Sequence, residues 1–180
     1  TFSGTTKTLN TGASAAFSST GSAHTITFSG GGLNIDTTSG AGFSATGGGT
    51  VNVTGTVNTI DTTTGTALNV ASTNIGASGL TFEHIAANGG ANGIVLNTTG
   101  ASGGLTVTGT ASAGSGGTIQ NIAGADLTTN NCGAAGAAAG VGVYLNSTKS
   151  PSLSWMNFTG TFGNFGILGY TVNGFTLDHA

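Results

Sequence analysis

Two neighbouring stretches, Asn92–Asn97 with the sequence NGIVLN and Gly104–Gly109 with the sequence GLTVTG, indicate the fold of this chain. In the second stretch, apolar Leu105 and Val107 alternate with threonine, which is the period-two pattern of a strand with one buried face. Glycine and asparagine at the ends of both stretches supply the conformations that tight turns need. The sequence therefore predicts short strands joined by tight turns.

Both stretches recur along the chain with a period of about 25 residues, which lies in the range of known repeat architectures. The first type has the anchor residues Phe17, Phe43, Leu68, Ile94, Val143 and Ile167, whose successive sequence numbers differ by 26, 25, 26, 49 and 24. The difference of 49 is close to two periods. The second type, apolar–polar–apolar, is found at Ile26–Phe28, Val51–Val53, Leu80–Phe82, Leu105–Val107, Leu153–Trp155 and Phe175–Leu177. A strand-and-turn unit repeated at a fixed period is typical of a solenoid, in which each repeat forms one rung.

We therefore predict an all-β parallel solenoid of about six rungs, forming a single domain over residues 1–180. Equivalent residues of successive rungs would stack in columns about 4.8 Å apart. One inward column would hold Phe43, Leu68 and Ile94, and another would hold Phe82, Val107 and Trp155. Asn97 and Asn146 align between rungs, which predicts a hydrogen-bonded asparagine ladder at a turn.

Residues 123–140 break the period. This alanine- and glycine-rich stretch is expected to be an irregular rung, a looped-out insertion, or a short helix interrupted by Gly136. Exposed terminal rungs need a polar capping segment, and none is seen at the C-terminus. We therefore expect the chain to be part of a longer protein, or a subunit whose ends are covered by neighbours.

The composition excludes several classes of protein. Only two residues are basic, Lys7 and Lys149, and charged residues make up 4% of the chain. Nucleic-acid binding needs clustered Lys or Arg to neutralise phosphates, so it is not expected. No apolar run is long enough to cross a membrane as a helix. The single cysteine, Cys132, cannot form an internal disulfide.

The glycine-led runs followed by GLTVTG resemble the right-handed parallel β-helix of the pectin-lyase-like superfamily. They are closest in style to the Gly/Thr/Asn-rich β-helical repeats of bacterial surface proteins and autotransporter passenger domains. The resemblance implies the right hand of the helix and a role as a stalk, an adhesin or an enzyme. Enzymes of the superfamily cleave acidic polysaccharides with calcium-binding acids and a basic residue, or with sets of Asp residues. This chain has no Arg, no Asp-Asp pair and no Asn-Thr-Asp motif, so we expect no catalytic residues, no cofactor and no metal site.

The remaining polar candidates are the dipeptides Glu83-His84 and Asp178-His179, which occupy equivalent places in their rungs. Stacked three rungs apart, they would be separated by about 14 Å, too far to share a metal. We expect single polar residues on solvated turns.

Two ligand-binding alternatives follow from other residues. The candidate ligand contacts are Trp155, Tyr144, Tyr170, Glu83 and His84. The three aromatic residues would contact a carbohydrate, although Trp155 falls at an inward position that favours a core role. Threonine pairs such as Thr54/Thr56 and Thr106/Thr108 suggest an ice-binding face, on which Glu83, Met156 and Asp178 would interrupt the threonines.

Together these observations predict a non-enzymatic extracellular or cell-surface protein with a structural or adhesive role. A stalk, a passenger segment or a filament subunit fits this prediction. A surface with few charges is poorly protected against association, so self-association or contact with neighbouring segments of the same protein is expected. The alternatives are a carbohydrate-binding or polysaccharide-processing β-helix and an ice-binding solenoid.

Overall fold

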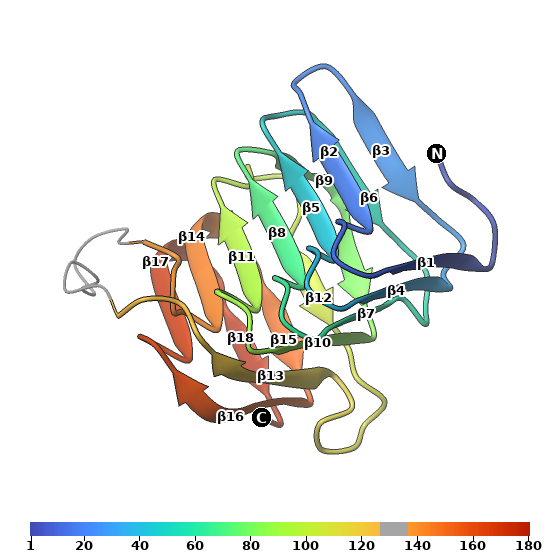
Figure 1. Ribbon diagram of the computed structural model, residues 1–180. Helices are drawn as coiled ribbons and strands as arrows, with labels where there is room; N and C mark the ends of the chain where they lie inside the picture. Colours follow the sequence, from blue (N-terminus) through green and yellow to red (C-terminus); the bar gives the residue numbers. More distant parts are fainter. Residues whose placement is uncertain (127–136) are drawn as a thin grey trace.

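The computed structural model describes residues 1–126 and 137–180 and shows a parallel β-solenoid (Figure 1). Three sheets of six strands each run along the solenoid, and all strand pairs within them are parallel. Each turn contributes one strand to each sheet, in the order first, second and third sheet. The predicted all-β solenoid of about six rungs is confirmed.

The strands have the following bounds. The first sheet contains β1 (Lys7–Thr11), β4 (Leu33–Thr37), β7 (Thr59–Thr62), β10 (His84–Asn88), β13 (Gly117–Ile122) and β16 (Met156–Phe162). The second sheet contains β2 (Phe17–Thr20), β5 (Phe43–Thr46), β8 (Leu68–Ala71), β11 (Ile94–Asn97), β14 (Val143–Lys149) and β17 (Ile167–Asn173). The third sheet contains β3 (Thr25–Phe28), β6 (Thr50–Val53), β9 (Asn74–Phe82), β12 (Leu105–Val107), β15 (Ser152–Ser154) and β18 (Thr176–Asp178).

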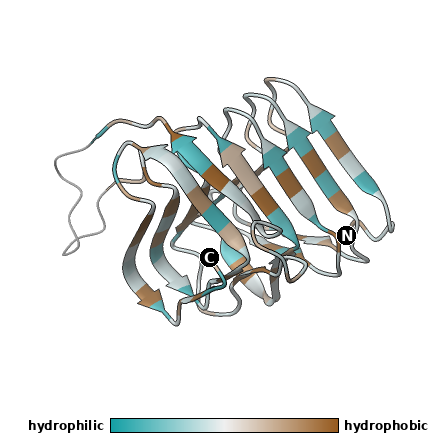
Figure 2. Cartoon of the chain, turned by 90° about the horizontal axis from the view of Figure 1, so that it is seen from below, coloured by the Kyte–Doolittle hydropathy of each residue, from teal (hydrophilic) through white to brown (hydrophobic). Residues whose placement is uncertain are grey.

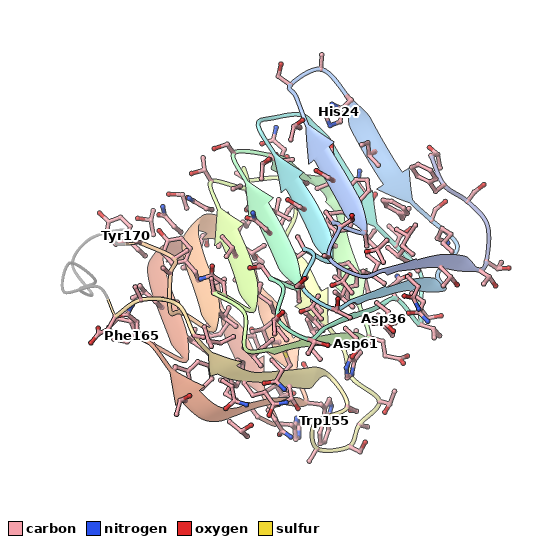
Figure 3. The ribbon with its side chains drawn as sticks, viewed as in Figure 1. His24, Asp36, Asp61, Trp155, Phe165 and Tyr170 are labelled. Atoms are coloured by element: carbon pink, nitrogen blue, oxygen red, sulfur yellow. The ribbon has the colours of Figure 1, made fainter. Side chains whose placement is uncertain are left out.

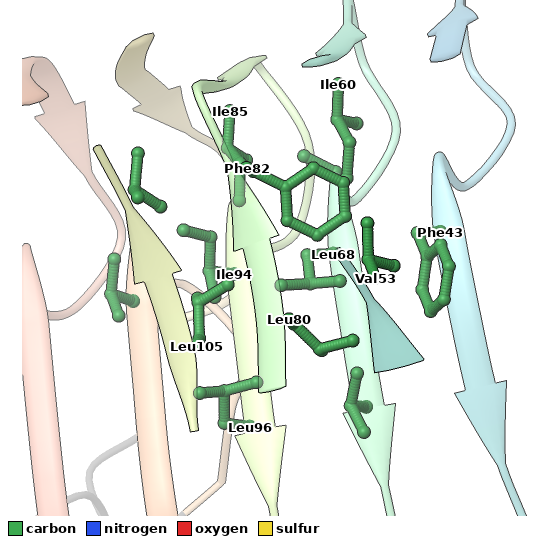
Figure 4. Packing of buried hydrophobic residues seen from close by; sticks show 14 of the residues in the cluster. Phe43, Val53, Ile60, Leu68, Leu80, Phe82, Ile85, Ile94, Leu96 and Leu105 are labelled. Atoms are coloured by element: carbon green, nitrogen blue, oxygen red, sulfur yellow. The ribbon is translucent and has the colours of Figure 1, made fainter. Parts of the chain in front are cut away.

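In strands such as β4, buried Leu33 and Ile35 alternate with exposed Asn34 and Asp36, so the apolar side chains lie inside the solenoid. Figure 2 shows hydrophobic and hydrophilic bands along the strands. The anchor residues of the sequence repeat form one inward column in the second sheet, where each pairs with its equivalent in the next turn. Ile35, Ile60 and Ile85 form the corresponding column of the first sheet and are fully buried. Both columns belong to one continuous core, and Figure 4 shows the anchors Phe43, Leu68 and Ile94 together with Ile60 and Ile85 in it.

The long interval between Ile94 and Val143 corresponds to one turn, because these two residues pair directly. The additional residues lie in two connections, 108–116 between the fourth and fifth turns and 123–142 within the fifth turn. In earlier turns the much shorter segments 38–42 and 63–67 make the same connection as 123–142. Cys132 and part of the 123–140 stretch, including Gly136, lie outside the described residues, so the expected helix is not addressed there.

The prediction that Trp155 belongs to the column of Phe82 and Val107 was wrong. Leu153 pairs with Val107 and takes that place, fully buried. Trp155 follows the end of β15 with φ 59°, where the chain leaves the strand direction. Met156 was expected to face outward, but it is the first residue of β16 and is fully buried. The period-two pattern gave the correct face for Leu153 but could not show where the strand ends.

Among the described residues, no helix is long and apolar enough to span a bilayer.

Candidate functional site

The outer face of the first sheet brings together charged and polar side chains from successive turns. Asp36 of β4 pairs in register with Asp61 of β7, so their side chains lie in one outward column (Figure 3). A second outward column contains Asn34, Thr59 and His84. The parallel register brings these residues together from three successive turns of the solenoid.

His84 connects this face to a longer loop. Its Nε2 atom lies 3.1 Å from Asp61 Oδ1, and its Nδ1 atom lies 3.2 Å from the backbone oxygen of Ser115. The hydrogen bond with Asp61 raises the pKa of His84 above its ordinary value of 6.5, while partial burial of the ring opposes the shift. The side chains of His84 and Asp61 are 30% and 52% exposed, so the pair is partly screened by water.

The loop that supplies Ser115 spans residues 108–116 and joins β12 to β13. Trp155 lies beside it, since the Gly116 amide donates to the Trp155 oxygen at 2.9 Å. A Cβ atom on Gly109 would lie 2.7 Å from the Cβ of Trp155, so the loop backbone packs closely against this residue. His179 stacks on the indole, with the ring centroids 4.0 Å apart. Trp155 is therefore half-buried between a loop and an imidazole.

The dipeptides Glu83-His84 and Asp178-His179 occupy the same corner of the solenoid, as their sequence positions predicted. Glu83 follows β9, and His179 follows β18 three turns later. Each histidine has its own carboxylate partner, because His179 Nδ1 lies 2.8 Å from Asp178 Oδ1. In residues 1–126 and 137–180, no group of three or more His, Cys, Asp or Glu residues is placed to hold a metal ion.

The three aromatic candidates do not converge. Tyr144 is only 3% exposed, in a small cluster outside the second sheet formed with Val95, Val141 and Leu168. Burial raises the pKa of its hydroxyl, against the effect of a hydrogen bond with Asn146. Tyr170 is 36% exposed on β17 of the second sheet, whereas Trp155 lies at the corner between the third and first sheets (Figure 3).

A shallow groove of about 480 Å³ lies beside the Asn34–Thr59 column and was not expected from the sequence. Its lining carries the hydroxyls of four threonines and the Asn34 amide, but apolar atoms form the larger part of its surface, including the side chain of Val57, which is 56% exposed. Its lining residues are Thr5, Thr6, Gly30, Gly32, Asn34, Thr56, Val57 and Thr59. The repeats Ile35-Asp36-Thr37 and Ile60-Asp61-Thr62, one period apart, are the sequence signal that marks this face.

The predicted asparagine ladder is confirmed at the corner between the second and third sheets. Asn97 and Asn146 pair in register, and the Asn146 amide donates to Asn97 Oδ1 at 2.9 Å. Two residues further along the chain from each asparagine, the hydroxyls of Thr99 and Thr148 form a buried hydrogen bond of 2.7 Å. The polar groups of this corner therefore bind one another from turn to turn.

Comparison with protein-family models, with curated proteins and with solved structures found no match for this chain. The assignment of the fold as a parallel β-solenoid rests on the sheet topology of the structure alone.

Proposed function

We propose that this chain is a non-enzymatic structural or adhesive segment of an extracellular or cell-surface β-solenoid. The observation that supports the proposal is the continuity of the core, which runs from Phe28 in the first turn to Met156 in the last. Backbone hydrogen bonds between parallel strands link every turn to the next. This construction holds a long outer surface in one fixed shape.

The right-handed pectin-lyase-like assignment and the closeness to autotransporter passengers belong to the same proposal. Their support is the glycine-led repeat of the sequence together with the three parallel sheets. The asparagine ladder between the second and third sheets fits such a helix, because side-chain amides stack well between identical turns.

Force spectroscopy tests the structural role. With the chain held between its ends, we expect extension in steps of one turn, since each turn contacts only its neighbours. Proteolysis by a broad-specificity protease should spare the strands under native conditions. Extension at very low force without steps, or rapid cleavage within the strands, would contradict the proposal.

Self-association through the last described turn is included in this proposal. Leu177 of β18 is 43% exposed, although its pairing partner Leu153 is fully buried. Phe175 is 40% exposed beside it. Covering this apolar face with another turn would bury both side chains, at roughly 25 cal/mol per Å² of apolar area.

Sedimentation of the chain and two variants tests this association. Leu177→Asp should lower the average mass at high concentration. Val57→Asp is the matched control, because Val57 is also exposed but lies between β6 and β7, several turns away from β18. Equal effects of both variants, or a monomeric parent chain, would exclude association through the last turn.

Carbohydrate binding is the second candidate, and the groove beside Asn34 and Thr59 favours it. Its threonine hydroxyls and the Asn34 amide could bond to sugar hydroxyls, and its larger apolar surface, which includes Val57, offers a contact for a ring face. Saturation-transfer NMR with a panel of neutral oligosaccharides should show contacts that Val57→Ala and Thr59→Ala remove. Contacts that persist in both variants would place sugar binding elsewhere.

The ice-binding alternative gains less support from the structure. Thr106 lies in β12, whereas Thr54, Thr56 and Thr108 lie in connections between strands. The register of the third sheet also shifts between β6 and β9. A flat threonine surface across all turns is not formed by these residues.

A further inference from the structure

The His84 ring lies between two groups that only accept hydrogen bonds. The Asp61 carboxylate faces Nε2 at 3.1 Å, and the Ser115 carbonyl faces Nδ1 at 3.2 Å. A neutral imidazole carries one N–H, so it can donate to only one of them, whereas an imidazolium donates to both. The geometry therefore matches the protonated form of His84.

The charged groups around His84 act in the same direction. Asp61 comes from β7, Glu83 precedes His84 in the chain, and both raise its pKa. Asp36 lies one turn beyond Asp61 in the same outward column. The loop 108–116 and strand β13 contain no titratable side chain, so no cation opposes protonation from those two elements.

Hydrogen bonds of the Ser115 side chain hold the tip of the loop together. The Ser115 hydroxyl accepts from the Thr110 amide at 2.8 Å and donates to the Ser112 oxygen at 2.6 Å. The bond from His84 to the Ser115 oxygen joins this tip to the first sheet, beside a backbone bond from the Ile85 amide of the same strand to the Gly116 oxygen at 3.0 Å. On its other side, Gly116 bonds to the backbone of Trp155.

We propose that loop 108–116 is a proton-controlled latch, closed while His84 is an imidazolium that bridges Asp61 and Ser115. Loss of the proton removes one of the two hydrogen bonds and leaves two lone pairs facing each other. The loop end is then held to the first sheet only by backbone bonds such as the one from Ile85 to Gly116, so residues 110–115 open more readily and the surroundings of Trp155 change with them.

The raised pKa of His84 gives the direction of this change with pH. The bridge contributes fully below the ordinary value of 6.5, because the ring is then protonated in both closed and open loops. Its contribution is lost as the pH rises through the raised pKa. The closed latch therefore belongs to the acidic side and the open latch to the alkaline side.

Nitrogen-detected NMR of the three histidine rings, combined with hydrogen exchange of the loop amides, tests the latch in the full chain. At acidic pH both ring nitrogens of His84 should have imidazolium shifts, with a midpoint above 6.5. Exchange at Ser115 and Gly116 should accelerate beyond the intrinsic dependence on pH across that midpoint. The acceleration should be about tenfold for each pKa unit that separates closed and open loops.

Three variants test whether His84 and Asp61 cause the pH dependence of loop exchange. Asp61→Asn should lower the His84 midpoint, and His84→Asn should abolish the additional acceleration of loop exchange. Asp36→Asn is the matched control, because it removes the neighbouring carboxylate of the same column but no hydrogen bond of His84. It should shift the midpoint less than Asp61→Asn does.

Trp155 supplies a second readout, since it is the only tryptophan. Its emission should change at the His84 midpoint in a His179→Asn background, which removes the stacked imidazole. The proposal is overturned if loop exchange has the same pH dependence in the parent and His84→Asn. A His84 midpoint that Asp61→Asn leaves unchanged would also overturn it.

Discussion

Asn58 is a single side chain that joins three segments of the solenoid. It is 1% exposed, and its Oδ1 atom accepts the Leu33 amide at 3.0 Å. Its Nδ2 group donates to the backbone oxygens of Gly55 and Thr81 at 3.2 and 3.0 Å. Backbone groups at this corner cannot reach a strand partner, so a buried side-chain amide satisfies them instead.

We expect Asn58→Ala to lower the free energy of unfolding by about 2–4 kcal/mol, because it leaves buried backbone groups without partners. Asn10→Ala removes an exposed amide from β1 and should change it by less than about 0.5 kcal/mol. Urea denaturation followed by circular dichroism measures both. Equal losses in the two variants would show that the Asn58 bonds contribute nothing specific.

At the scale of the elements, glycine is required where turns stack most closely. Gly65, between β7 and β8, lies against the corner of the preceding turn, and a Cβ atom there would be 1.9 Å from the Gly40 oxygen. Gly90 repeats this position one turn later, with the Gly65 oxygen 2.7 Å away. The atoms in contact are backbone, which a side-chain rotation cannot move aside.

Gly65→Ala is therefore expected to destabilise the chain by about 1–3 kcal/mol, as overpacking does in protein cores. Gly166→Ala is the control, since nothing lies within 4 Å of the position where its Cβ would be. Thermal denaturation compares the two. A Gly65→Ala chain as stable as the control would show that the turns can separate slightly without loss.

In the core, Leu68 represents the anchor column. It is fully buried between Phe43 and Ile94. Leu68→Ala should cost about 2–5 kcal/mol, because close packing on both sides prevents the cavity from collapsing. The same urea denaturation measures it, and a loss below about 1 kcal/mol would indicate a loosely packed interior.

For the whole molecule, stability should decrease from the middle turns toward the last one. Inward residues of the third and fourth turns, such as Ile60 and Ile94, are fully buried, whereas Ile167 and Leu177 of the last turn are partly exposed. Each turn gains stability mainly from its two neighbours, so a terminal turn with one neighbour opens more easily.

Native-state hydrogen exchange followed by mass spectrometry tests this gradient. Amides of β7 to β12 should exchange only through global unfolding, and those of β16, β17 and β18 through local opening. The exchange is measured at low protein concentration, so that association between chains does not protect the amides of the last turn. Uniform protection across all six turns at low concentration would contradict the expected gradient.

The sequence by itself determined the solenoid, its period and its inward anchors. Phe43, Leu68 and Ile94 recur at nearly constant spacing, and a parallel stack converts constant spacing directly into register. The hydrogen-bonded ladder of Asn97 and Asn146 could be predicted for the same reason, because the two residues occupy equivalent positions in the repeat. Local alternation and turn residues carry this information because both depend on neighbours in the chain.

Only the tertiary structure decided where the period fails and what meets on the outer face. Trp155 left the core because β15 ends at Ser154, and the sequence pattern gives the face of a residue but not the end of its strand. His84 met Asp61 and Ser115, which are distant from it in the sequence, because stacking and a longer loop brought them together. Such contacts depend on the height and corner at which each segment lies, and these are properties of the assembled stack.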